Sequence, residues 1–82
     1  MDTICLFASD YAVPQALHGA LKNMLALPEY YGMNADALND CLSEMISCPG
    51  LWFRADGEEN VNAALRLAAR VFEDNGAKVK EL

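Results

Sequence analysis

The chain has 82 residues, of which 54% are hydrophobic, and a formal net charge of −6. This composition suits one small domain over residues 1–82. The charge is too low for a disordered chain and has the wrong sign for binding nucleic acid. No apolar run is long enough to span a membrane, and residues 1–20 lack the pattern of a signal peptide. We therefore expect a cytoplasmic protein with no nucleic-acid or membrane partner, monomeric when free.

The cysteines also bear on the compartment. There are three of them, Cys5, Cys41 and Cys48, and all stand among apolar residues. On a continuous helix Cys41 and Cys48 would lie about 10 Å apart along the axis, too far for a disulfide. No Cys/His spacing typical of a metal site is present. The sequence predicts buried, reduced thiols, no metal and no cofactor.

The first third of the chain predicts a strand followed by a helix. Residues 3–8 form a continuous apolar run, which is typical of a strand covered on both faces, as in a parallel sheet. Pro14 suits a first helical turn, and an apolar stripe that includes Leu17 and Leu21 continues to about residue 26. His18 falls off this stripe and is interpreted as a surface histidine.

The middle of the chain predicts a turn and a second helix. Pro28 ends the first helix, Gly32 can supply a positive φ for the turn, and Asn34 is a plausible N-cap. Residues 48–50 end the second helix. Its predicted buried side consists of Leu38, Cys41, Leu42, Met45 and Ile46.

The last third predicts a strand at residues 51–54, a helix at 60–75 and a final strand at 77–82. Trp52 and Phe53 are assigned to the core, and Gly76 is a natural residue after a helix end. The order of elements indicates a small α/β domain. We expect the first strand, the most apolar, in the centre of the sheet, and the last strand at an edge protected by Lys78 and Lys80.

The charges between these elements are unusual. Between Lys22 and Arg54 there is no basic residue, whereas Asp36, Asp40 and Glu44 recur every four residues. On a helix they would share one face, and each like-charged pair would destabilise it by roughly 0.2–0.5 kcal/mol. An acidic face of this kind beside two tyrosines indicates a surface for a cationic partner.

Residues 25–42 carry a specific resemblance. The pattern Leu-Pro-Glu-Tyr-Tyr-Gly-x-Asn-x-Asp-Ala-Leu-x-Asp-Cys-Leu, which occupies residues 27–42, resembles the hallmark of the barstar family. These proteins are intracellular bacterial inhibitors of secreted ribonucleases of the barnase type. The resemblance implies a three-stranded parallel sheet packed with three to four helices. It also implies an immunity or antitoxin role, in which the second helix and the loop before it block a ribonuclease.

The resemblance also implies site residues. Asp40 matches the carboxylate that enters the ribonuclease active site, and Asp36 adds a second anion one turn away, as RNA presents successive phosphates. Glu44 and Tyr31 are secondary candidates. The partner-binding positions carried over from the family are Tyr30, Gly32, Asn34, Ala35, Asp36, Asn39 and Asp40.

Three departures from the family leave the identity of the target open, the first being a segment between Arg54 and Asn60 that is shorter than usual. Asn39 stands where the familiar inhibitor has a tryptophan. Counting back from Gly76 without a gap places Val71 where the family has a carboxylate on its last helix. Glu73 and Asp74 would lie on different faces of that helix.

Other interpretations remain. Asp36 could serve only the helix N-terminus, Tyr31 could be core, and Asn34 could be a cap rather than a contact. The acidic face could bind a basic protein that is not a nuclease. Asp36, Asp40 and Glu44 could also hold Mg²⁺ or Ca²⁺, although no phosphate loop, nucleophile elbow or nearby histidine supports an enzyme. We expect no catalytic residues.

Overall fold

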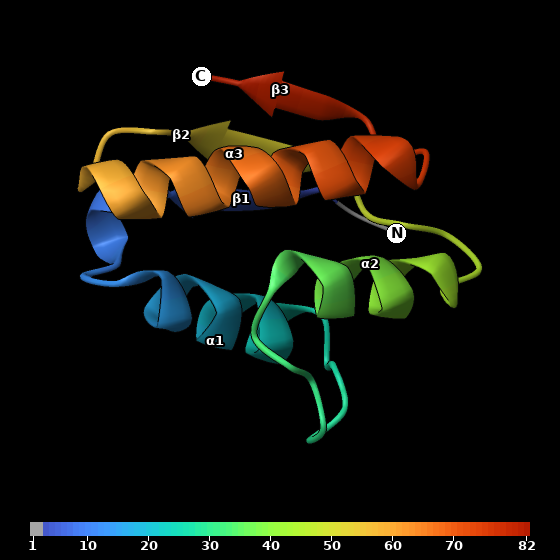
Figure 1. The fold of residues 1–82 in the computed structure, drawn as a ribbon. Coiled ribbons are helices and arrows are strands. Elements are labelled where there is room, and N and C mark those ends of the chain that lie inside the picture. The colour runs from blue at the N-terminus through green and yellow to red at the C-terminus, as the bar shows by residue number, and fades with distance from the viewer. Residues whose placement is uncertain (1–2) are drawn as a thin grey trace.

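The computed structural model describes residues 3–82. A short 3₁₀ turn, η1 (Ala8–Asp10), follows the first strand. Among the described residues, no helix is long and apolar enough to cross a bilayer. Figure 1 shows the arrangement of the elements. In chain order the strands and helices are β1 (Ile4–Phe7), α1 (Pro14–Met24), α2 (Ala35–Ser43), β2 (Leu51–Arg54), α3 (Glu59–Asp74) and β3 (Val79–Glu81).

The three strands form one parallel sheet in the order β1-β2-β3. Leu6, Phe53 and Glu81 lie in register across it. The expected α/β fold with a three-stranded parallel sheet and three helices is confirmed, as is the edge position of the last strand. The expectation that the first strand is central is wrong, because β2 pairs on both sides and β1 pairs only with β2.

Only one face of the sheet is covered. In β2, Leu51 and Phe53 are buried, whereas Trp52 is 47% exposed and Arg54 is exposed. Cys5 lies in register with Trp52 and is also exposed. The prediction of Trp52 in the core is therefore wrong, and β1 is not covered on both faces. An apolar run does not distinguish a strand buried on both faces from one whose outer side chains stay at the surface.

Helix α3 is the centre of the structure. It packs against β2 and β3 and also against α1 and α2, as Figure 1 shows. Because α3 lies between the sheet and the other two helices, its residues Leu65 and Phe72 are fully buried. The predicted helix at 60–75 is confirmed to within one residue. Gly76 follows it with φ 87°, a conformation that favours glycine.

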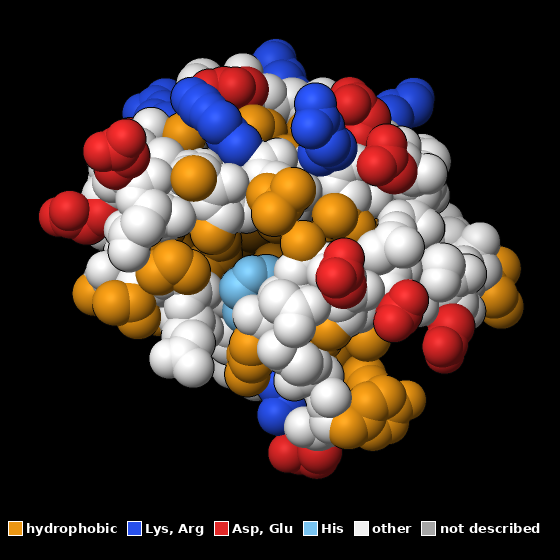
Figure 2. Space-filling view, in the orientation of Figure 1, with side chains coloured by type: hydrophobic (Ala, Val, Ile, Leu, Met, Phe, Trp, Pro, Cys, Tyr) orange, Lys and Arg blue, Asp and Glu red, His pale blue; other side chains and the backbone are white. Residues whose placement is uncertain are grey.

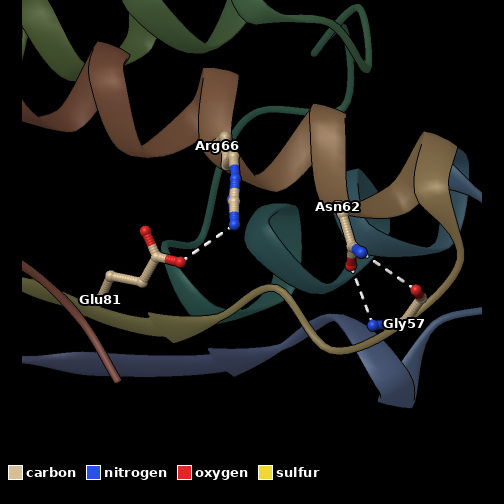
Figure 3. A network of polar contacts seen from close by, with 4 residues as sticks. All are labelled: Gly57, Asn62, Arg66 and Glu81. Carbon is tan, nitrogen blue, oxygen red and sulfur yellow. Dashed lines mark hydrogen bonds and ion pairs between the residues drawn. The ribbon is translucent and has the colours of Figure 1, made fainter.

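Two polar contacts fix α3 over the sheet (Figure 3). The side chain of Asn62 accepts a hydrogen bond from the backbone N–H of Gly57 and donates one to its carbonyl, at 2.9 and 3.0 Å. Arg66 forms an ion pair of 3.0 Å with Glu81 on β3. Gly57 is needed here because a Cβ would come within 2.6 Å of the Ala8 backbone. The turn before α3 therefore lies tightly against the end of β1.

Two sequence expectations about the helices fail. His18 on α1 is 6% exposed, so it is not a surface histidine. Helix α2 ends at Ser43, where the N–H groups of Glu44 and Met45 donate to the carbonyls three residues earlier, at 3.3 and 3.1 Å. Ile46 then lies beyond the helix and is fully exposed, contrary to its predicted burial.

The thiols are less buried than expected. Cys5 is exposed, while Cys41 and Cys48 are half-buried, and all three are free. Burial raises the pKa of the Cys48 thiol. The prediction that all three thiols are buried is therefore wrong.

Candidate functional site: the loop before α2 and its acidic face

The loop between α1 and α2 projects from the body of the molecule (Figure 1). The backbone N–H of Tyr31 donates to the carbonyl of Pro28 at 2.9 Å and closes a turn. The positive φ angles fall on Ala26 (52°) and Met33 (57°), so the expectation of a positive φ at Gly32 is wrong. Gly32 instead lies close to the first turn of α2. A Cβ there would lie 3.2 Å from Asn34 Nδ2 and 3.3 Å from Ala37 Cβ.

Buried side chains hold this projecting loop. Leu27 and Tyr31 are 8% and 5% exposed, and the Tyr31 hydroxyl lies 2.7 Å from Nδ1 of His18. Burial lowers the pKa of His18 and raises that of Tyr31 to about 12. The imidazole and the phenol therefore share one hydrogen bond, in which the tautomer of His18 decides which group donates. The packing interpretation of Tyr31 is confirmed, and His18 has a structural role that the helical stripe did not reveal.

Asn34 is the N-cap of α2, as predicted. Its Oδ1 accepts from the N–H of Ala37 at 2.8 Å, and its Nδ2 donates to the carbonyl of Gly32 at 3.0 Å. Both ends of the amide are thus used within the protein. Asn34 fixes the path by which the loop enters the helix.

The acidic face consists of Asp36, Asp40 and Glu44, and all three are exposed. The two ion pairs of residues 3–82 join Lys22 to Glu29 and Arg66 to Glu81, and neither includes a member of this face. The last turn of α2 contains no basic residue. The helix dipole therefore favours Asp36 but opposes Asp40 and Glu44, which stand toward the negative end.

The surface in Figure 2 shows this separation of charge. Over α2 the visible charged side chains are Asp and Glu, whereas most of the visible Lys and Arg side chains gather at the opposite edge, over α3 and β3, where further Asp and Glu side chains stand among them. The acidic face is thus uncompensated locally, which is unfavourable for the isolated helix and favourable for a cationic partner.

Asn39 is tied to α3. Its Oδ1 accepts a hydrogen bond of 2.8 Å from Asn75, the C-cap residue of α3, which also donates to the carbonyl of Val71. Sequence reasoning missed Asn75, although an Asn before Gly at a helix end is a recognisable signal. Val71, on the same helix, is buried. Asp74, which precedes Asn75 in the chain, is exposed.

A groove of about 520 Å³ runs between the loop and α2. Tyr30, which is 83% exposed, and the carboxylate-bearing Asp40 and Glu44 line it together with apolar Leu25 and Met45. Burial raises the pKa of Cys41 in the same wall, with smaller contributions from Glu44 and then Asp40. The structure thus brings Tyr30, Gly32, Asp40 and Glu44 to one groove, whose apolar wall sequence reasoning did not identify.

Comparison with known families shows to which family the chain belongs. The family model described as Barstar (barnase inhibitor) matches residues 3–80. The chain belongs to the Barstar family. A protein of Bacillus subtilis (strain 168) named "Putative ribonuclease inhibitor YrdF" is 41% identical over 49 residues, which are 60% of this chain and 54% of that protein. The chain thus spans about half the length of this curated relative.

Membership of the Barstar family confirms the resemblance of residues 27–42 and, for the matched residues 3–80, the expectation of an inhibitor domain rather than an enzyme. The metal interpretation of Asp36, Asp40 and Glu44 is not supported. Within residues 3–82 no group of three or more His, Cys, Asp or Glu side chains is arranged to hold a metal ion.

Proposed function

We propose that this protein inhibits a basic ribonuclease by inserting the acidic face of α2 into the cationic active site of the enzyme. The observation that carries the proposal is the exposure of Asp36 and Asp40, with no ion-pair partner among residues 3–82, on a capped helix of a Barstar-family protein. In its cleft a ribonuclease holds phosphates with cations, and the same cations can hold carboxylates.

The chemistry of the carboxylates supports this mechanism. A carboxylate can accept two charge-assisted hydrogen bonds from one Arg, as a pair of phosphate oxygens does. Asp36 and Asp40 are separated by about 6 Å along the helix axis, so they present two anions in succession. Asp40 would enter the active site and Asp36 would meet a neighbouring cation.

The other residues would shape the contact. Tyr30 offers a large exposed ring at the rim, and aromatic side chains are enriched at such interfaces. Gly32 and Ala35 allow close approach of the backbone. Asn34 and Asn39 hold the helix in place through their internal hydrogen bonds while their exposed edges face the partner. Glu44 adds a third carboxylate, and Tyr31 supports the loop from inside.

We further propose that the partner is a barnase-type or other toxin ribonuclease, made by the same cell or delivered by a competitor and met in the cytoplasm. The free inhibitor would be monomeric. The departures at Asn39 and Val71 remove a large apolar group and a carboxylate, which would favour an enzyme other than barnase itself.

The test is inhibition of a panel of purified microbial ribonucleases. One enzyme should be inhibited stoichiometrically. Asp40→Asn should weaken that inhibition by about 3–5 kcal/mol, or more than about 100-fold, because a buried cation of the enzyme loses its partner. Glu73→Gln removes the same charge from an exposed position beside a separate groove and should change inhibition little.

Two outcomes would contradict the proposal. The first is that no ribonuclease is inhibited. The second is that Asp40→Asn and Glu73→Gln behave alike. Tight binding of a basic protein without nuclease activity, abolished by Asp40→Asn, would replace the inhibitor by a general acidic binding module.

A further inference from the structure

The sheet has a second surface that the proposed function does not use. We call it the outer sheet face and define it by Cys5, Phe7, Trp52, Arg54 and Lys80. Cys5 is in register with Trp52 and Lys80, and Phe7 is in register with Arg54. Their strand neighbours Leu6, Leu51 and Phe53 are buried under the helices. Alternation along the strands therefore turns these five side chains away from the helices.

Two cations lie on two aromatic rings of this face. The guanidinium carbon of Arg54 is 5.8 Å from the centroid of the Phe7 ring, and Nζ of Lys80 is 5.2 Å from that of Trp52. Neither cation is a member of an ion pair among residues 3–82. The one acidic residue of the strands, Glu81, pairs with Arg66 on α3 instead. The outer sheet face thus presents cations that are held in place by the rings and that no carboxylate of residues 3–82 neutralises.

A third cation extends the surface. Lys78 is exposed, and its carbonyl accepts a hydrogen bond of 2.9 Å from the N–H of Leu51, so its backbone continues the line of β3. It stands two residues before Lys80, and the period of two places both side chains on the same side. Three of the six basic residues of the chain thus belong to this small face.

We propose that the outer sheet face binds an acidic segment of another protein. Carboxylates of that segment would meet Arg54, Lys80 and Lys78, and one of its apolar side chains would cover the exposed part of Trp52. Charge complementarity and the half-exposed indole both favour this occupant.

Single-stranded nucleic acid fits this face less well. Bases bind such surfaces by stacking on free aromatic faces, but here the ring faces already carry Arg54 and Lys80. Three cations also give weak phosphate binding in a chain whose net charge is −6. A carboxylate, by contrast, can bind the outward side of each cation without displacing it from its ring.

This surface is separate from the acidic face of α2. Figure 1 shows α2 and the loop at the bottom of the view and β2 and β3 at the top, with α3 between them. Both surfaces can therefore be occupied in one molecule. The inference goes beyond the inhibitor proposal and does not depend on it.

Fluorescence tests the proposal directly, because Trp52 is the only tryptophan of the chain. The intact protein is titrated with a synthetic peptide of alternating Asp and Leu, with a Lys and Leu peptide of the same length, and with oligouridylate. We expect a saturable change in Trp52 emission with the acidic peptide alone, which weakens as salt is added.

Matched variants locate the site. Arg54→Gln combined with Lys80→Gln should weaken peptide binding about tenfold or more, because two charge-assisted contacts are lost. Lys22→Gln removes a cation that pairs with Glu29 near the loop and should leave peptide binding unchanged. Asp40→Asn should also leave it unchanged, so failure here is distinguishable from failure of the inhibitor proposal. Circular dichroism verifies that each variant is folded.

Three results would overturn the proposal. One is the absence of any saturable response to the acidic peptide. Another is equal weakening by Lys22→Gln, which would mean that binding follows net charge alone. The third is tighter binding of oligouridylate through Arg54 and Lys80, which would make the face a nucleic-acid site.

Discussion

The acidic face of α2 and the outer sheet face make an informative pair. Each places exposed charges near an exposed aromatic ring: Tyr30, beside the acidic face, is 83% exposed, and Trp52, in the outer sheet face, is 47% exposed. On the sheet, Arg54 and Lys80 lie over rings that stabilise them. On α2, Asp36 and Asp40 have no such neighbour, and helical spacing sets them against each other.

The difference separates two ways of displaying charge. The outer sheet face keeps its cations at little cost to folding, because each is already engaged with a ring. The acidic face of α2 displays carboxylates that the helix itself disfavours, and it relies on the loop anchors and the contact between Asn39 and Asn75 to remain in place. A surface of this second kind gains most from a partner of opposite charge.

The largest expected effect on stability concerns the support of the acidic face. Gly32→Ala would place a Cβ tightly against Asn34 and Ala37, so one of these neighbours must shift by a few tenths of an ångström. We expect a loss of about 1–3 kcal/mol of unfolding free energy and weaker ribonuclease inhibition. Chemical denaturation and inhibition assays measure the two effects.

Gly19→Ala is the matched control for this change. Gly19 lies inside α1, and a Cβ there meets nothing within 4 Å. The substitution should therefore raise stability by about 0.5–1 kcal/mol without changing inhibition. If Gly32→Ala behaved in the same way, the tight approach at the loop would have no role. Trp52 emission should be unchanged in both folded variants.

The next effect is a pH dependence that originates behind the loop. Burial lowers the pKa of His18 in the folded state below its ordinary value of 6.5, so the unfolded chain takes up a proton first as the pH falls. Stability should decline below about pH 6.5, by at most about 1.4 kcal/mol per pH unit for this one group, until folded His18 also protonates.

His18→Gln provides the comparison for the pH experiment. The contribution of His18 to the slope should disappear in this variant, even if its stability at neutral pH is lower. Denaturation curves recorded between pH 5 and about 7.5 give the difference between the two slopes. Identical slopes would show that the bond to Tyr31 does not respond to pH.

The smallest effects should have opposite signs on the two faces. Asp40→Asn removes repulsion from Asp36 and Glu44 and should raise stability by about 0.2–0.5 kcal/mol per relieved pair. Lys80→Gln removes a cation from the Trp52 ring and should lower stability by about 0.5–1 kcal/mol. Thermal melts of the two variants against the native protein measure the signs. A loss of stability in both would remove the distinction between the faces.

Local patterns in the sequence were sufficient to predict the helices and strands and the exposure of the acidic residues. The N-cap at Asn34, the helix over residues 59–74 and Gly76 after it follow from capping and periodicity, which act over a few residues. The exposure of Asp36 and Asp40 follows from their position opposite Leu38 and Leu42 on the same helix. Hydrogen bonds between distant segments, such as His18 to Tyr31 and Asn39 to Asn75, leave no comparable pattern.

The sequence by itself thus determined the class of fold, the family motif and the charge of α2. Only the tertiary structure decided that β2 is central, that Trp52 faces outward and that His18 is buried. The physical reason is that hydrophobicity records how much a residue gains from burial. Which strand receives two neighbours, and which face receives the helices, depends on how all the elements share one core.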